Sequence, residues 1–249
     1  MTSLFCCPVC GAPLEREERV YRCPGGHSYD IAKEGYTYLL PPNRKHSADP
    51  GDDKAMAAAR RDFLSKGYYS PLLNTICNWI NTLSDEKPVI LDAGCGTGFC
   101  GGFLKKYRSF RGLYGVDISE KMLEQAQAKK VYSHLLQSEL EQYFSQAKTK
   151  FDLIVSADVF TYFGSLEKLL SGMADSLSAG GRVIFTVSEN NLNEDDYFLH
   201  SSGRYLHHQN YVGKVLEKAG FEVEKLERAK LRNEGENIVY GYVVSALKK

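Results

Sequence analysis

Three cysteines and a histidine near the start of the sequence have the spacing of a metal site. Cys7 and Cys10 form a C-x-x-C pair, and Cys23 and His27 form a C-x-x-x-H pair. Three thiolates and one imidazole make a closed tetrahedral zinc site, which is typical of structural rather than catalytic zinc. The hairpin between the two pairs, residues 12–21, is polar, so we expect it to need the ion in order to fold.

Cys6 is an alternative to Cys7 as the first ligand, because it would form C-x-x-x-C with Cys10. We favour Cys7, since a two-residue gap with Gly11 after the second cysteine gives a tighter turn. Four of the seven cysteines lie in the first 23 residues. In a reducing compartment this clustering favours metal over disulfides. The alternative to a metal site is a set of free thiols with a surface histidine.

A glycine-rich turn follows an apolar segment further along the chain. Residues 89–93 are predicted to form a buried strand, residues 94–98 read Gly-Cys-Gly-Thr-Gly, and residues 99–107 have a helical pattern. Strand, glycine turn and helix form the first unit of a nucleotide-binding α/β fold. A dinucleotide fingerprint requires G-x-G-x-x-G, but Phe99 occupies the third glycine position. The glycines alternate instead, and they begin two residues after Asp92.

This D-x-G-x-G-x-G pattern resembles that of the class I S-adenosylmethionine-dependent methyltransferases. The resemblance implies an α/β fold with a Rossmann-like, mostly parallel sheet and S-adenosylmethionine as cofactor. This cofactor has no pyrophosphate, so Asp92 can accept from its ammonium group, directly or through water. A second acid, Asp117, ends a predicted strand over 112–117, where a carboxylate accepts from both ribose hydroxyls. The residues that we expect at the cofactor are Asp92, Gly94, Cys95, Gly96, Gly98, Asp117 and Ile118. The alternative is a glycine-rich turn with an unrelated surface acid.

Length and composition allow one large domain together with a small module. The chain has 249 residues, of which 43% are hydrophobic and 25% are charged, as in ordinary globular proteins. The net charge is zero, so any nucleic-acid binding must come from a local patch. No apolar run approaches 18 residues and no signal-peptide pattern is present, so we expect a cytoplasmic protein without a membrane partner.

The predicted organisation has three parts: a zinc-binding module over residues 1–40, a linker and helix over 41–75, and the cofactor-binding domain over 76–249. Residues 28–75 combine basic side chains with tyrosines, which suits single-stranded or looped RNA. A solvated linker with tyrosines in the core explains the same composition.

The remaining pattern of the C-terminal part alternates strands with helices. Strands are expected near 132–136, 151–157, 181–188, 221–228 and 238–247. Helices are expected after Ser119 and near 139–147, 165–177 and 208–219.

The end of the fourth strand should face the methyl group, because ligands of open α/β sheets bind beyond the carboxyl ends of the strands. We therefore expect Asp158, Phe160 and Tyr162 to line the pocket. A polar insert precedes the last helix and could cap the substrate. Its members are Ser202, Gly203, Arg204, Tyr205, His207 and His208. The alternative for this insert is a loop with solvated histidines.

The N-terminal third carries a more specific resemblance. The zinc motif, "HSYDIAKEGYTYLL" and "DPGDDKAMAAARRDFLSKGYYSPL" resemble residues of the large-subunit ribosomal RNA guanine-N1 methyltransferases, over roughly 5–76. The resemblance implies that the zinc module helps to hold an RNA hairpin. It also implies that the tyrosine of a G-x-Y-x-P-L segment, here Tyr69, lies beside the cofactor. After the fourth strand, "SADVFTYFGSLEKLL" resembles a different class I group.

The leading hypothesis is methyl transfer from S-adenosylmethionine to N1 of a guanine in large-subunit ribosomal RNA. N1 of guanine carries a proton that must leave, and Asp158 is the candidate acceptor. The first alternative is a small-molecule methyltransferase with a structural zinc cap. The second is an RNA-binding protein with a degenerate core, against which the intact glycine loop and Asp117 argue. A homodimer is left open as the oligomeric state.

Overall fold

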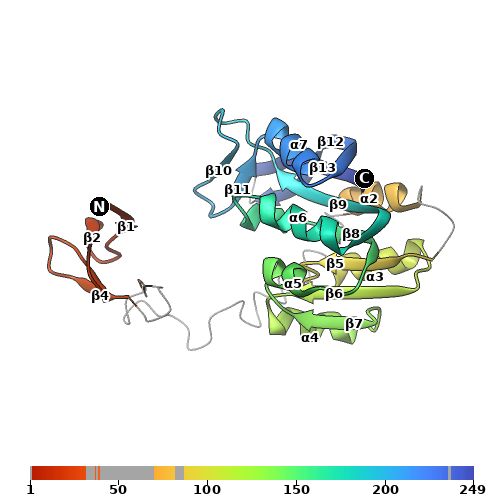
Figure 1. Ribbon diagram of the computed structural model, residues 1–249, viewed down its shortest axis with the longest axis horizontal. Helices are drawn as coiled ribbons and strands as arrows, with labels where there is room; N and C mark the ends of the chain where they lie inside the picture. The colour runs from red at the N-terminus through yellow and green to blue at the C-terminus, as the bar shows by residue number, and fades with distance from the viewer. Residues whose placement is uncertain (1, 32–36, 38, 40–69, 82–86, 235–236) are drawn as a thin grey trace. The chain divides into compact units, whose positions relative to one another are not determined.

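The chain folds into two compact units. The computed structural model describes residues 2–31, 37, 39, 70–81, 87–234 and 237–249 (Figure 1). The units are Met1–Ala58 and Ala59–Lys249, and each is described by itself. Among the described residues, no helix has both the length and the apolar character needed to cross a membrane.

The smaller unit is an antiparallel sheet in the order β1-β2-β3-β4. Its strands are β1 (Thr2–Cys6), β2 (Pro13–Glu17), β3 (Val20–Arg22) and β4 (Ser28–Asp30). The turns after β1 and β3 carry the cysteines. Its described core consists of Cys7, Leu14 and Cys23, with four partly buried apolar neighbours. A core of this size buries too little apolar surface to fold alone, so the unit depends on another source of stability.

The larger unit contains a seven-stranded sheet in the order β12-β13-β9-β8-β5-β6-β7. The strands are β5 (Val89–Ala93), β6 (Gly112–Asp117), β7 (His134–Gln137), β8 (Phe151–Ser156), β9 (Leu177–Ser188), β12 (Phe221–Glu234) and β13 (Asn237–Lys248). The five strands from β9 to β7 run parallel, whereas β13 pairs antiparallel with β9 and β12 antiparallel with β13. The strand order reverses beside β5, and ligands of such sheets bind at this point.

Helices cover both faces of this sheet (Figure 1). The helices are α2 (Ser70–Asn81), α3 (Phe99–Tyr107), α4 (Glu120–Ala128), α5 (Leu140–Gln146), α6 (Glu167–Ser176) and α7 (Gln209–Lys218), with a short 3-10 helix η2 (Phe160–Tyr162). One buried cluster joins α2 and α3 to the sheet, and the other joins α5, α6 and α7 to it. Leu153 and Val155 of β8 belong to the first cluster and Ile154 to the second, as the alternation of a strand requires.

The predicted strands and helices of the larger unit are present, with shifts at several ends. β9 begins at Leu177 rather than near residue 181, and β12 continues to Glu234 because its pairing with β13 resumes after two register shifts. The polar insert overlaps a hairpin of two three-residue strands: β10 (Tyr197–Leu199) precedes the insert, and β11 (Tyr205–His207) lies within it. Strands this short carry too little alternation to be predicted.

The predicted boundary at residue 76 falls inside a helix. α2 buries Leu73, Ile76 and Ile80 against the same cluster as α3, so both of its halves pack with the large sheet. The predicted helix near 54–65 lies outside the described residues.

The ring of Tyr132 occupies a slot formed by glycines. An added Cβ would lie 2.9 Å from a ring carbon at Gly98, 2.3 Å from the hydroxyl oxygen at Gly101, and 3.0 Å from a ring carbon at Gly115. These glycines belong to the loop before α3, to α3 and to β6. The glycine-rich composition of this region therefore makes room for a tyrosine as well as for a turn.

Replacing Gly101 by alanine should lower the free energy of unfolding by about 1–3 kcal/mol, the usual cost of overpacking, because the new methyl group would collide with Tyr132. Gly213→Ala is the matched control: Gly213 also lies within a helix, but no atom lies within 4 Å of its added Cβ. The free energy of unfolding of the control should rise by about 0.5–1 kcal/mol, because alanine lowers the backbone entropy of the unfolded chain. Urea unfolding measures the free energy of unfolding of both variants. Equal changes in the same direction would contradict the close packing of Tyr132 on Gly101.

Candidate functional site

The structure brings the four predicted metal ligands together. One donor atom from each of Cys7, Cys10, Cys23 and His27 lies within 4.8 Å of every other. The Sγ atoms of Cys10 and Cys23 are 3.6 Å apart, and Sγ of Cys23 lies 3.2 Å from Nδ1 of His27. Donors at the corners of a zinc tetrahedron are separated by about 3.8 Å for a bond of about 2.3 Å. The donor set therefore fits zinc in both chemistry and spacing.

The two cysteines that the sequence left as alternatives have different environments. Cys6 is exposed and lies outside the donor cluster, whereas Cys7 is buried within it. Burial opposes ionisation of Cys7, but a hydrogen bond with Tyr29 and the backbone of Cys10 and Val9 outweighs it, and the pKa of the thiol falls to about 6. A thiolate is the form that binds a metal.

The glycine loop has the backbone that its sequence predicts. Gly94, Gly96 and Gly98 have φ values of 76°, 53° and 74°, in the left-handed region that favours glycine. The backbone N–H groups of Gly94 and Cys95 donate to the carbonyl of Val116 at 2.8 and 3.0 Å, which ties the loop to the end of β6. Cys95 is buried beneath the loop, and burial raises the pKa of its thiol.

Asp117 lies at the end of β6, beside the glycine loop. Its two carboxylate oxygens accept from the N–H of Gly96 at 2.8 Å and of Ser119 at 2.9 Å. Each oxygen keeps a second lone pair, so the carboxylate is oriented and can still accept further hydrogen bonds. The neighbouring Ile118 is 68% exposed. A fixed acid beside an exposed apolar side chain suits a ribose next to a base.

Asp92, the first acid of the motif, is buried under the loop. The hydroxyl of Tyr132 donates to its Oδ2 atom at 2.6 Å. Burial raises the pKa of Asp92 to about 6, although the Tyr132 hydrogen bond opposes this rise. The sequence suggested the cofactor's ammonium as the partner of Asp92. In the structure, this carboxylate instead accepts a hydrogen bond from Tyr132, forty positions away.

Asp158 follows β8 and lies next to the glycine loop. An added Cβ on Gly94 would lie 2.4 Å from the side chain of Val159, so residues 158 and 159 adjoin the turn. Asp158 has a φ of 59°, and its N–H donates to Oγ1 of Thr186 at 2.8 Å. Its Oδ1 atom accepts from Nη1 of Arg232 at 2.6 Å.

Arg232 of β12 was not found from the sequence. Its side chain is only 5% exposed, and its guanidinium also reaches Oγ of Ser188 at 3.5 Å. The ion pair joins residues 74 positions apart, and no spacing pattern connects them. Because Arg232 is largely buried, it holds the carboxylate of Asp158 in one orientation.

The two aromatic residues expected to line the pocket differ in exposure, which corrects the prediction for one of them. Phe160 is fully buried and stacks on Phe185 with ring centroids 4.3 Å apart, so it belongs to the core. Tyr162 is 54% exposed and available to a ligand. Within one turn of 3-10 helix the two side chains point in different directions, and the sequence does not distinguish them.

The two histidines of the polar insert, His207 and His208, make hydrogen bonds within the fold. His207 is buried, its Nε2 atom lies 3.0 Å from the carbonyl of Gly164, and burial lowers its pKa. His208 caps α7, where its side chain accepts from the N–H of Asn210. Thr161 donates to the carbonyl of Tyr205 at 3.4 Å. The hairpin is therefore packed on η2, beside Asp158, and is not a loop with solvated histidines.

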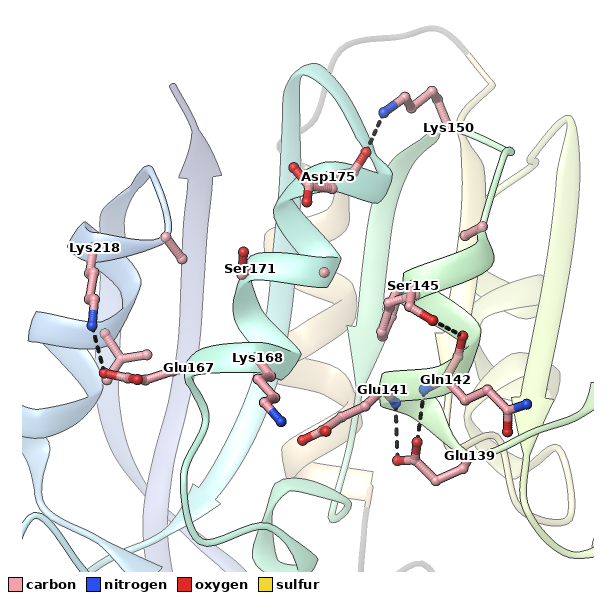
Figure 2. Close-up of a pocket in the computed structure, with 15 residues that line it drawn as sticks. Glu139, Glu141, Gln142, Ser145, Lys150, Glu167, Lys168, Ser171, Asp175 and Lys218 are labelled. Carbon is pink, nitrogen blue, oxygen red and sulfur yellow. Dashed lines mark hydrogen bonds and ion pairs between the residues drawn. The ribbon is translucent and has the colours of Figure 1, made fainter.

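A polar groove lies on a different part of the larger unit, between α5, α6 and α7. Figure 2 shows its charged side chains, among them Glu139, Lys150 and Asp175. Glu167 pairs with Lys218 at 2.9 Å across its edge, and Lys150 donates to the carbonyl of Asp175. None of the described residues that line the groove belongs to the glycine loop or to η2. Tyr69, the remaining predicted cofactor residue, lies outside the described residues.

Comparisons with known proteins find matches for both the N-terminal and the C-terminal part of the chain. Residues 5–48 match a zinc-ribbon family model described as the N-terminal part of RlmA, and residues 91–185 match a methyltransferase domain. A crystal structure of magnesium protoporphyrin IX methyltransferase from Synechocystis PCC 6803 with bound SAM superimposes with a TM-score of 0.56. The two sequences are 18% identical, and the superposition covers 83% of this chain and 89% of the Synechocystis chain. At this identity, the likeness shows the fold alone.

Two curated relatives resemble the chain in sequence. A "Putative 23S rRNA (guanine-N(1)-)-methyltransferase" from Micromonospora griseorubida is 37% identical over 110 residues, and the match covers 37% of this chain and 36% of that protein. A "23S rRNA (guanine(748)-N(1))-methyltransferase" from Streptomyces fradiae is 33% identical over 123 residues, 48% of this chain and 42% of that protein. The chain thus spans less than half the length of either relative.

The fold and the glycine loop define a class I S-adenosylmethionine-dependent methyltransferase domain. The chain joins this domain to an RlmA-type zinc ribbon over residues 5–48, within the stretch 5–76 whose sequence carries the resemblance.

The buried carboxylate of Asp92 should make stability depend on pH. Because the pKa of Asp92 rises from 3.8 to about 6 in the fold, its charged form costs stability above pH 6, and the cost disappears as pH falls towards 4. Asp92→Asn keeps an acceptor for Tyr132 and should be more stable than the native protein at pH 8, by about 1–3 kcal/mol.

Urea unfolding between pH 4.5 and 8 measures this difference, which should shrink on acidification. Asp117→Asn is the control: both of its carboxylate oxygens accept backbone N–H groups, so an amide should destabilise the protein at pH 8. A native-to-Asp92→Asn difference that stays constant across this pH range would be inconsistent with a buried, titrating carboxylate.

Proposed function

We propose that the protein transfers a methyl group from S-adenosylmethionine to N1 of a guanine in 23S ribosomal RNA. The observation that carries this proposal is the joining of an RlmA-type zinc ribbon to a methyltransferase domain in one chain. Both curated relatives are named for guanine-N1 methylation of 23S rRNA. The arrangement of the glycine loop, Asp117 and Asp158 at one edge of the sheet supports the chemistry.

We assign the cofactor to the glycine loop and the ends of β5 and β6. Asp117 would accept from the ribose hydroxyls and Ile118 would contact the adenine. Gly94, Gly96 and Gly98 let the backbone approach the ligand. Tyr69 and the backbone around Cys95 complete the proposed set, and Asp92 supports the loop from beneath. S-adenosylmethionine supplies an electrophilic methyl group when bound.

For the acceptor, the chain must position guanine and remove its proton. N1 loses a proton as it gains the methyl group, and we assign that proton to the carboxylate of Asp158. Arg232 is assigned as a positioning residue, because it holds Oδ1 of the same carboxylate. The side chain of Val159 lies where a Cβ of Gly94 would point, and this closeness to the glycine loop supports placing the neighbouring carboxylate beside the methyl group. Positioning and exclusion of water supply most of the remaining rate enhancement.

We assign one structural zinc ion to Cys7, Cys10, Cys23 and His27. Four protein donors leave no open coordination position, so the ion would organise the ribbon and take no part in the chemistry. The ribbon is assigned to an RNA hairpin, the partner that the resemblance implies. A cytoplasmic location and a homodimer complete the proposal, and sedimentation velocity tests the second.

The zinc assignment predicts different outcomes for adjacent cysteines. Cys7→Ala should lose the metal and unfold the ribbon, because Cys7 is both a donor and part of the small core. Cys6→Ala is the matched control and should keep one zinc per chain, since Cys6 is exposed and outside the cluster. Metal content is measured after purification without chelator. Loss of zinc from the Cys6 variant, or retention of zinc by the Cys7 variant, would indicate that Cys6 rather than Cys7 is the ligand.

Methyl transfer itself is tested with purified protein, isotopically labelled S-adenosylmethionine and 23S rRNA lacking the modification. The expected product after nucleolytic digestion is 1-methylguanosine. Asp158→Asn should lower kcat by roughly 10²–10⁴-fold, the usual contribution of a general base, with cofactor affinity unchanged. Asp152→Asn is the control, because Asp152 lies near the start of β8, whereas Asp158 follows the carboxyl end of that strand.

Full activity of Asp158→Asn would remove the base assignment and leave methyl transfer in place. An unlabelled RNA would overturn the proposed function itself. It would favour the small-molecule alternative, in which the zinc ribbon is a structural cap.

A further inference from the structure

The exposed face of Tyr162 lies in an unusual position for a surface aromatic. Scattered exposed apolar side chains need no explanation. Tyr162, however, is in η2, which directly follows Asp158 and Val159, and Val159 packs on Gly94 of the loop. The residue is 54% exposed and follows the carboxyl end of β8, the edge of the sheet where ligands of this fold bind.

A guanidinium accompanies this ring. Cζ of Arg204 lies 5.9 Å from the centroid of the Tyr162 ring. Arg204 precedes β11, in the turn of the β10–β11 hairpin, so the two groups come from segments about forty residues apart. A planar cation beside an exposed ring offers an unpaired base two surfaces for stacking, and it also attracts the phosphate backbone.

The hairpin holds this arrangement in place. Its second strand is fixed to η2 by Thr161, which donates to Tyr205, and to the following turn by His207, which reaches the carbonyl of Gly164. Gly164 lets the rings of Tyr197 and Tyr205 approach closely, since an added Cβ would lie 2.9 Å from each. The Tyr162–Arg204 pair is therefore built on packed elements, which makes it preorganised for a flat ligand.

We propose that Tyr162 and Arg204 form the platform on which the acceptor purine stacks, so that the substrate is an unpaired base in a looped RNA rather than a base within a duplex. This inference rests on the proposed function and names the part of the site that receives the base. A base inside a helix cannot reach the methyl group without leaving the stack. An aromatic face at the site would offset part of the cost of unstacking it.

The chain contains a matched control pair. Arg228 lies over the ring of Tyr240, with Cζ 4.2 Å from the centroid, and Tyr240 is also exposed. This pair belongs to β12 and β13, and Arg228 makes a bidentate ion pair with Glu189. Tyr240→Ala therefore removes an exposed ring with a guanidinium over it that belongs to neither η2 nor the β10–β11 hairpin.

The test uses ribosomal RNA hairpins in two assays. In the first, kcat/KM for methyl transfer is measured for Tyr162→Ala, Tyr162→Phe and Tyr240→Ala. The kcat/KM of Tyr162→Ala should be roughly ten- to hundredfold below the native value, which is the range for one base–aromatic stack. Tyr162→Phe keeps the ring and should stay within about threefold of the native value. Tyr240→Ala should be unchanged, and cofactor affinity should be the same in all four proteins.

The second assay needs no catalysis. A hairpin with 2-aminopurine at the acceptor position reports stacking by loss of fluorescence, which the native protein should cause and Tyr162→Ala should not. Methylation of RNA with equal losses in Tyr162→Ala and Tyr240→Ala would overturn the platform and leave the proposed function standing. Quenching that depends on Tyr162 without methylation would support the platform while the proposed function fails. Absence of quenching by the native protein overturns the platform.

Discussion

The hydrogen bond from Tyr132 to Asp92 organises the part of the sheet on which the site depends. The tyrosine ring lies against glycines of the cofactor loop, of α3 and of β6, and its hydroxyl ends 2.6 Å from Oδ2 of Asp92. One side chain thus contacts three separate segments of the edge that would receive the cofactor. A larger residue at Gly101 or Gly115 would displace the ring, and the buried carboxylate would lose its donor. The alternating glycines therefore have two roles, since they form the turn and admit the tyrosine.

The second constraint joins the cofactor side to the substrate side. Ser156, at the end of β8, donates to the carbonyl of Ala93 at the end of β5, and the side chain of Val159 rests on Gly94. Asp158 is consequently fixed relative to the loop by packing and by its ion pair with Arg232. Each of these contacts comes from the carboxyl end of a strand, where a parallel sheet places the starts of its connecting loops. The fold thereby supplies most of the site's geometry before any ligand arrives.

Residues 89–117 show how far sequence reasoning reaches. Apolar runs, alternating glycines and a terminal acid predicted β5, the turn, α3 and β6, because each of these signals is local. Tyr132 and Arg232 could not be predicted, since they meet their partners 40 and 74 residues away through the fold alone. Phe160 and Tyr162 show a finer limit: both are aromatic residues of one short helical turn, yet one joins the core and the other faces outward. Their side-chain directions depend on neighbours that come from β9 and from the hairpin.

The smaller unit shows the same limit and its consequence for function. Spacing predicted a metal site but left Cys6 and Cys7 as alternatives, and burial separates them only once β1 and β2 are paired. Two of the four donors, Cys7 and Cys23, are also two of the three buried residues of its described core. Removing a metal from such a core would leave buried thiolates without the positive charge that offsets their burial, which is costly in an apolar environment. Metal binding and folding of the ribbon are therefore one equilibrium, and any surface that the ribbon offers to RNA exists only in its metal-bound form.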